Sequence, residues 1–221
     1  MLRRPVTVDR VHSLPAHQFE DADQQREAAS LGMWAFLVTE IMFFGGVFAG
    51  YAICRGLYTE GFAEASNKLN IILGATNTAV LICSSLTMAM AVRSAQLNKQ
   101  RELILFLLLT ILLGTGFLGI KAFEYSHKFH EHLVPGSMFQ FEGSNPGHAE
   151  IFFCFYFTMT GLHAVHMIIG IGVMVSLLLR ARKGHFSAEY NSPVEVSGLY
   201  WHFVDIVWIF LFPLLYLISR T

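Results

Sequence analysis

Five apolar segments divide this chain, and they constrain its fold more than any other feature. They run over about 30–55, 68–93, 102–123, 149–179 and 194–219, each near the ~20 residues that cross a bilayer as a helix. Backbone amides in lipid must be satisfied internally, and the segments lack the period-two alternation of barrel strands. We therefore predict an all-α membrane protein, a five-transmembrane-helix bundle.

The composition agrees with a membrane protein. Only 14% of the residues are charged, whereas a soluble domain carries roughly a quarter. The net charge of −1 gives no indication of a nucleic-acid partner. We divide the chain into a polar leader, 1–30, expected to be extended, and a single transmembrane helical domain, 31–221. The fourth segment exceeds one span, so we expect it to tilt or protrude.

Basic residues predict the orientation. Ten Lys and Arg residues lie in the leader and in the second and fourth connections, against five on the other side. Short cytoplasmic loops are enriched in Lys and Arg. The sequence therefore predicts a cytoplasmic N-terminus and a periplasmic C-terminus.

Ionisable side chains within the apolar segments are the candidate site residues, because such groups are costly in lipid and need partners. Glu40 lies in the middle of the first segment, where it could carry protons, contact a lipid headgroup or bond to another helix. His163 and His166 are three residues apart and share one helix face. They could share a metal ion, although hydrogen bonds to neighbouring helices are favoured, since no further ligand is placed beside them.

His202 and Asp205 repeat this spacing in the last segment. They could form a carboxylate-oriented imidazole beside a metal, but a contact between helices is again favoured. Glu124 stands near the predicted outer end of the third segment, where an interfacial ion pair with Lys121 is expected.

The outer loop, about 121–148, contains an H-x-x-H-x-H pattern. It is formed by His127, His130 and His132, and zinc is not favoured there because no predicted helix holds the three side chains. We predict no catalytic residue and no metal site. Glycines within the segments, Gly114 and Gly170 among them, predict close helix packing.

Several motifs occur in a recognisable order. They are GMWAFLVTE around Glu40, GFLGIKAFEY around Glu124, TGLHAVHMIIG around His163, and YWHFVDIVWIF around His202. In this order they resemble cytochrome c oxidase subunit III of the haem-copper oxidase family, in its five-helix bacterial form.

The resemblance implies an accessory subunit of a proton-pumping oxidoreductase complex, with no activity of its own. Haem and copper would lie in partner subunits, and this chain would bind phospholipid. The expected partners are subunit I, as the main contact, subunit II, other subunits and membrane lipids, and the complex could join a respiratory supercomplex. The expected location is the bacterial inner membrane, and the expected role is to stabilise subunit I and support proton uptake.

Other assignments stay open. A quinol oxidase or a nitric-oxide-reductase-associated homologue would contain a similar subunit, although glutamate rather than aspartate at position 40 favours the aa3-type cytochrome c oxidase. An autonomous membrane metalloenzyme or transporter would instead use the two histidine pairs as a metal or proton site.

Overall fold

The computed structural model describes residues 22–188 and 190–217, and within these ranges every regular element is helical. The elements are α1 (Ala22–Leu57), α2 (Thr59–Asn67), α3 (Ile71–Gln96), α4 (Gln100–His130), α5 (Pro146–Arg182), α6 (Ser192–Phe212) and the π-helical turn η1 (Pro213–Leu217). Five of the described helices are long and apolar enough to cross a membrane: α1, α3, α4, α5, and α6 together with η1. The prediction of an all-α fold with five spanning helices is confirmed.

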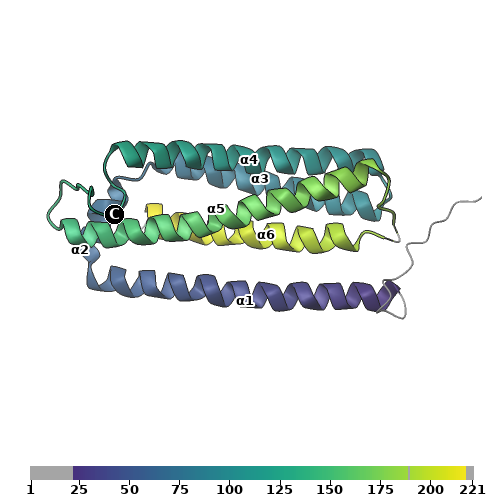
Figure 1. Ribbon diagram of the computed structural model, residues 1–221, viewed down its shortest axis with the longest axis horizontal. Coiled ribbons are helices and arrows are strands. Elements are labelled where there is room, and N and C mark those ends of the chain that lie inside the picture. The colour runs from purple at the N-terminus through teal and green to yellow at the C-terminus, as the bar shows by residue number, and fades with distance from the viewer. Residues whose placement is uncertain (1–21, 189, 218–221) are drawn as a thin grey trace, which may run out of the picture.

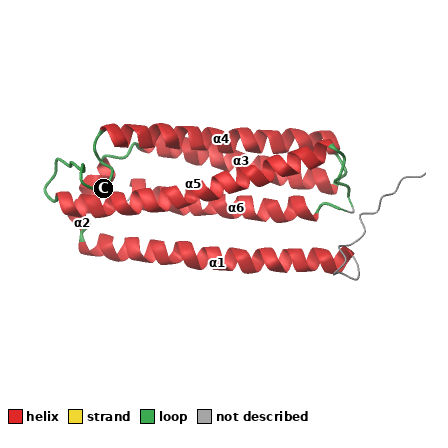
Figure 2. Cartoon of the chain, viewed as in Figure 1, coloured by secondary structure: helices red, strands yellow, loops and turns green. Residues whose placement is uncertain are grey.

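Helices α3 to α6 form a bundle, and α1 lies along its side (Figure 1). Short loops join the long helices at both ends (Figure 2). With 37 residues, α5 extends over roughly 55 Å, well beyond the ~30 Å hydrocarbon layer. It runs obliquely across the bundle (Figure 1), as its length led us to expect.

One stripe of α1 packs against the bundle. Leu37, Phe44 and Tyr51 are buried and seven residues apart, the repeat that keeps one helix face toward its neighbour. Exposed apolar side chains cover most of the remaining surface of α1, for example Trp34 and Met42. The first helix is therefore fastened along one line and leaves a wide apolar face for lipid or for other proteins.

Local signals define several helix ends. The Asn70 side chain caps α3 by accepting hydrogen bonds from the amides of Ile72 and Leu73, at 2.9 and 3.3 Å. Proline occupies the first turn of both α5 and α6, where its missing N–H costs nothing.

Pro213 ends α6, and the π turn that follows it exposes backbone carbonyls to other helices. The Tyr51 hydroxyl donates to the Leu214 carbonyl at 2.6 Å, and the Ser66 hydroxyl donates to the Leu215 carbonyl at 2.7 Å. Carbonyls released by a break in the helical ladder need such partners. The end of the last span thereby secures α1 and α2.

Three predicted boundaries are wrong. Helix α1 begins at Ala22, so residues 22–30 are helical rather than extended; the rest of the predicted leader lies outside the described residues. Helix α4 continues to His130 instead of ending near residue 123. The short helix α2 occupies a connection for which no element was expected.

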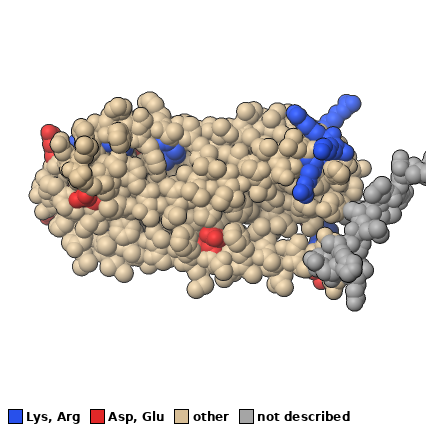
Figure 3. Space-filling model, viewed as in Figure 1, with Lys and Arg blue, Asp and Glu red and all other residues tan. Residues whose placement is uncertain are grey.

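Charged side chains are distributed unevenly along the bundle. Basic side chains gather at the end where α3 meets α4, and almost no charge interrupts the long middle of the visible face (Figure 3). This basic end contains the exposed residues Arg93, Lys99, Arg101, Arg180, Arg182 and Lys183. A neutral middle between charged ends is the pattern expected of a membrane-spanning bundle.

Candidate functional site

Trp201 occupies the centre of the bundle. Its indole Nε1 donates to the Ser84 hydroxyl of α3 at 3.0 Å, and the side chain is fully buried. A Cβ atom on Gly114 of α4 or on Gly170 of α5 would lie 2.8 or 2.9 Å from the indole ring. Both glycines therefore permit the close packing predicted for them, because a larger side chain would overlap the indole.

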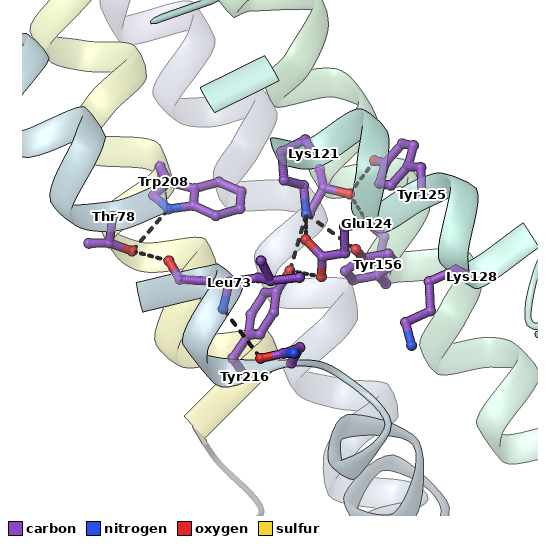
Figure 4. Close-up of polar contacts among 12 residues, drawn as sticks. Leu73, Thr78, Lys121, Glu124, Tyr125, Lys128, Tyr156, Trp208 and Tyr216 are labelled. Atoms are coloured by element: carbon purple, nitrogen blue, oxygen red, sulfur yellow. Dashed lines mark hydrogen bonds and ion pairs between the residues drawn. The ribbon is translucent and has the colours of Figure 1, made fainter. Parts of the chain in front are cut away.

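The most polar site of the interior surrounds Lys121 on α4 (Figure 4). Its Nζ donates to Glu124 Oε2 at 2.9 Å, to the Tyr156 hydroxyl at 3.2 Å and to the Tyr216 hydroxyl at 3.1 Å. Tyr216 in turn donates to Glu124 Oε1 at 2.5 Å. The ammonium group also lies 5.1 Å from the centre of the Trp208 ring, within the range of a cation–π contact.

This cluster corrects the expected role of Glu124. The ion pair with Lys121 is present, but the two side chains are only 2% and 5% exposed, and α4 continues for two further turns beyond them. The pair therefore belongs to the bundle interior, where tyrosines of α5 and η1 satisfy it, rather than to an exposed helix end.

A second lysine secures the end of α4. Lys128 Nζ donates to the Lys68 carbonyl, between α2 and α3, at 2.8 Å and to Glu131 at 2.5 Å. Burial raises the pKa of the Glu131 carboxyl, but the hydrogen bond and charge of Lys128 and the neighbouring His127 outweigh it, so the pKa is lowered overall. Glu131 therefore holds its negative charge beside Lys128 into acidic solution.

Glu40 and His166 meet across α1 and α5. Glu40 Oε2 lies 3.2 Å from His166 Nε2, and the two side chains are 19% and 14% exposed. The other ring nitrogen of His166 lies 2.8 Å from the Leu162 carbonyl of its own helix. Of the three roles left open for Glu40, the structure shows the contact between helices.

His163 does not share a site with His166, although the two histidines are on one helix. It is fully buried between Phe117 and Trp208, with ring centres 5.4 and 5.2 Å away. Neither of its ring nitrogens bonds to any described residue. The interpretation that both histidines bond to neighbouring helices is correct for His166 and wrong for His163, which packs as an aromatic ring.

His202 and Asp205 face α3, yet they do not bond to each other. His202 Nδ1 lies 2.7 Å from the Ser85 hydroxyl. Asp205 is 3% exposed, and neither carboxyl oxygen makes a hydrogen bond with a described residue. The contact between helices is confirmed for His202 but not for Asp205.

The histidines of the outer connection have separate surroundings. His127 lies on α4 and contacts Glu131 at 3.2 Å, and the His148 ring stacks on Tyr58 at 4.3 Å. Within residues 22–188 and 190–217, no group of three His, Cys, Asp or Glu side chains is placed to hold a metal ion. The polar groups of the described chain thus act mainly as fastenings between helices.

Fold and site together define a polytopic helical membrane protein whose inward polar side chains tie one helix to the next. Comparison with known sequences is more specific: residues 16–220 match the cytochrome c oxidase subunit III family. The chain belongs to this family, whose members are subunits of haem-copper oxidases, multi-subunit oxidoreductase complexes.

Individual relatives align over nearly their full length. Cytochrome c oxidase subunit 3 of Alkalihalophilus pseudofirmus is 32% identical over 96% of this chain and 97% of its own. The corresponding protein of Thermostichus vulcanus is 30% identical over 91% and 92%. Quinol oxidase subunit 3 of Bacillus spizizenii is 31% identical over 86% of each chain.

Sequence reasoning missed the centre of the polar cluster. Lys121 appeared to end an apolar segment, and Tyr156 and Tyr216 appeared to be ordinary aromatic residues. One signal was available: a lysine followed three residues later by a glutamate forms an ion pair on one helix face, and such a pair within a span calls for partners on other helices.

Proposed function

We propose that the chain is the non-catalytic subunit III of a bacterial aa3-type cytochrome c oxidase, in which it stabilises subunit I and supports proton uptake during oxygen reduction. Haem and copper would reside in the partner subunits, and phospholipid would cover the apolar faces that remain. The chain would lie in the bacterial inner membrane.

One observation carries this proposal: the candidate polar residues are divided among separate contacts and do not converge. Glu40 pairs with His166, Glu124 pairs with Lys121, and His202 bonds to Ser85. A catalytic centre requires several such groups around one reacting atom, whereas contacts of this kind hold a bundle together in lipid. The exposed apolar face of α1 supports assembly with other membrane components.

The electron donor separates this proposal from its main alternative, subunit III of a quinol oxidase. Relatives of both kinds show similar identity, 32% and 31%. The test is to purify the tagged chain from its native membrane in mild detergent and to record a reduced-minus-oxidised spectrum. Haem a bands with co-purifying subunits I and II support the proposal; haem b alone favours a quinol oxidase or a nitric-oxide-reductase-associated complex. A colourless chain that retains stoichiometric metal and has no partner contradicts it.

Glu40 tests the non-catalytic role directly. Glu40→Gln removes the charge but retains a side chain that can bond to His166, so turnover of the purified complex should stay largely unchanged. Glu102→Gln, the same change at an exposed position of α4, is the matched control. Complete loss of oxygen reduction in Glu40→Gln alone would show that the carboxyl takes part in the reaction or its proton supply.

A further inference from the structure

A groove between α3 and α6 contains polar groups that packing within this chain does not satisfy. It encloses about 410 Å³ and is lined along its rim by Ile82, Leu86, Ile206 and Ile209, all of which are about half exposed or more. Ser85, His202 and Asp205 form its floor. The rim is thus apolar and the floor is polar.

Hydrogen bonding on the floor is incomplete. The Ser85 hydroxyl has one proton, and it lies 2.7 Å from His202 Nδ1. It also lies beside Asp205, but neither carboxyl oxygen there achieves hydrogen-bond geometry with a described residue. The other ring nitrogen of His202 has no described partner either. Asp205, although 97% buried, therefore retains unused capacity for a hydrogen bond directly under the groove.

The depth of Asp205 limits what can bond to it. Asp205 lies near the middle of the last span, Ser192–Leu217, roughly 20 Å along the helix from either end. Lipid headgroups lie outside the ~30 Å hydrocarbon layer and do not reach this depth. An acyl chain could fill the apolar rim, but it offers no hydrogen-bond donor to the floor.

A helix from another protein satisfies both requirements, since it can present apolar side chains to the rim and one polar side chain to the floor. We infer that this groove is the docking site for a transmembrane helix of another subunit, which donates a hydrogen bond to Asp205 beside His202. A single polar contact at mid-span is a common means of fixing the register of two membrane helices. The inference goes beyond the proposed function and holds for either electron donor, because it requires only a partner subunit.

Photo-crosslinking from the groove rim tests the occupant. A benzophenone amino acid replaces Ile206 or Ile209 in the intact complex, and Leu112 on α4, exposed to a similar degree, serves as the control position. Adducts from both rim positions should contain a transmembrane peptide of a second subunit, whereas Leu112 should give mainly lipid adducts. Rim adducts confined to lipid, to a quinone or to a second copy of this chain would overturn the inference.

Substitution of Asp205 supplies a second measurement. Asp205→Leu should leave the purified full chain as stable as the wild type or more so, because it removes a buried group without a partner. The same variant should lower retention of the partner subunit in detergent by about three- to tenfold, the effect of one hydrogen bond between membrane helices. Asp205→Asn, which can still bond, should keep most of that retention.

The opposite effects on chain and complex distinguish docking from a purely internal role. If Asp205→Leu destabilises the isolated chain and the complex alike, Asp205 serves the fold of this chain and the inference fails. If the wild-type chain purifies without any partner, the proposed function fails instead. A complete complex whose crosslinks avoid the groove contradicts the docking site alone.

Discussion

Two lysine–glutamate pairs of α4 have the same sequence spacing but very different surroundings. Lys99 and Glu102 are joined at 2.9 Å with side chains 53% and 48% exposed, and Lys121 and Glu124 are joined at the same distance with side chains 5% and 2% exposed. Solvent screens the first pair, so it contributes little to stability. The second pair lies where loss of one charge leaves the other without compensation.

This contrast gives a matched test at the residue scale. Lys121→Met should lower the free energy of unfolding by about 3–5 kcal/mol, because it strands Glu124 in the interior. Lys99→Met should have almost no effect. Thermal unfolding of the two variants in one detergent gives the comparison, and equal melting temperatures would show that the interior pair is not a stabilising contact.

A second residue-scale test uses two glycines of α5. A Cβ on Gly170 would overlap Trp201, whereas nothing lies within 4 Å of a Cβ on Gly172. Gly170→Leu should destabilise the bundle by at least about 1–3 kcal/mol through overpacking, while Gly172→Leu should be tolerated. Fluorescence of the three tryptophans should shift only in the first variant, and an equal response in both would contradict the central position of Trp201.

Residue types alone could identify which polar groups need partners, but not which partners they have. Glu40 was recognisable from its place in an apolar run, and its contact with another helix agrees with one of the predicted roles. The partner, His166, lies 126 residues away, and the spacing of His163 and His166 instead suggested that both face one site. Rotation of α5 about its axis separates them, and no local pattern encodes that rotation.

At the scale of single elements, the end of α4 is the least expected feature. Glu131, Lys128 and the Lys68 carbonyl join the C-terminus of α4 to the start of α3. The sequence pattern placed these residues in a loop because polar residues and histidines interrupt the apolar run. They extend the helix instead, since charged side chains at a helix C-terminus outside lipid are readily accommodated.

The lowered pKa of Glu131 gives this junction a defined dependence on pH. A carboxyl whose pKa is lower in the folded chain than its ordinary value of 4.5 adds stability that is fully present above pH 4.5 and is lost as pH falls through the lowered value. Wild type should therefore exceed Glu131→Gln in melting temperature near neutral pH, and the difference should shrink below pH 4.5. A difference that grows on acidification would show that the sign of the shift is wrong.

For the whole molecule, the odd number of spanning helices places the described start of α1 and the end of η1 at opposite ends (Figure 1). The basic end, which contains Lys183, is predicted to face the cytoplasm. In a chain whose Cys54, Cys83 and Cys154 are replaced by alanine, a membrane-impermeant maleimide added to intact cells should label Ser137→Cys and should spare Lys183→Cys. The reverse pattern would invert the topology.

The number of helices and their order were predictable because each span must satisfy its own backbone in lipid. Their lateral arrangement was not, because lipid and protein interiors are both apolar and the outward faces resemble the inward ones. Exposed Ile206 and buried Val207 are adjacent and chemically alike, so hydropathy cannot tell which of them meets another helix. Only the small residues around Trp201 gave a direct sign of the packed side.

The break at Pro213 also affects the order in which the protein is completed during synthesis. Tyr51 and Ser66 are made early, yet the carbonyls that accept their hydrogen bonds, those of Leu214 and Leu215, are among the last groups to leave the ribosome. The first helix therefore waits in the membrane, held by its apolar seam, until translation reaches the C-terminal turn. Final fastening of α1 thus reports that the whole chain has been made.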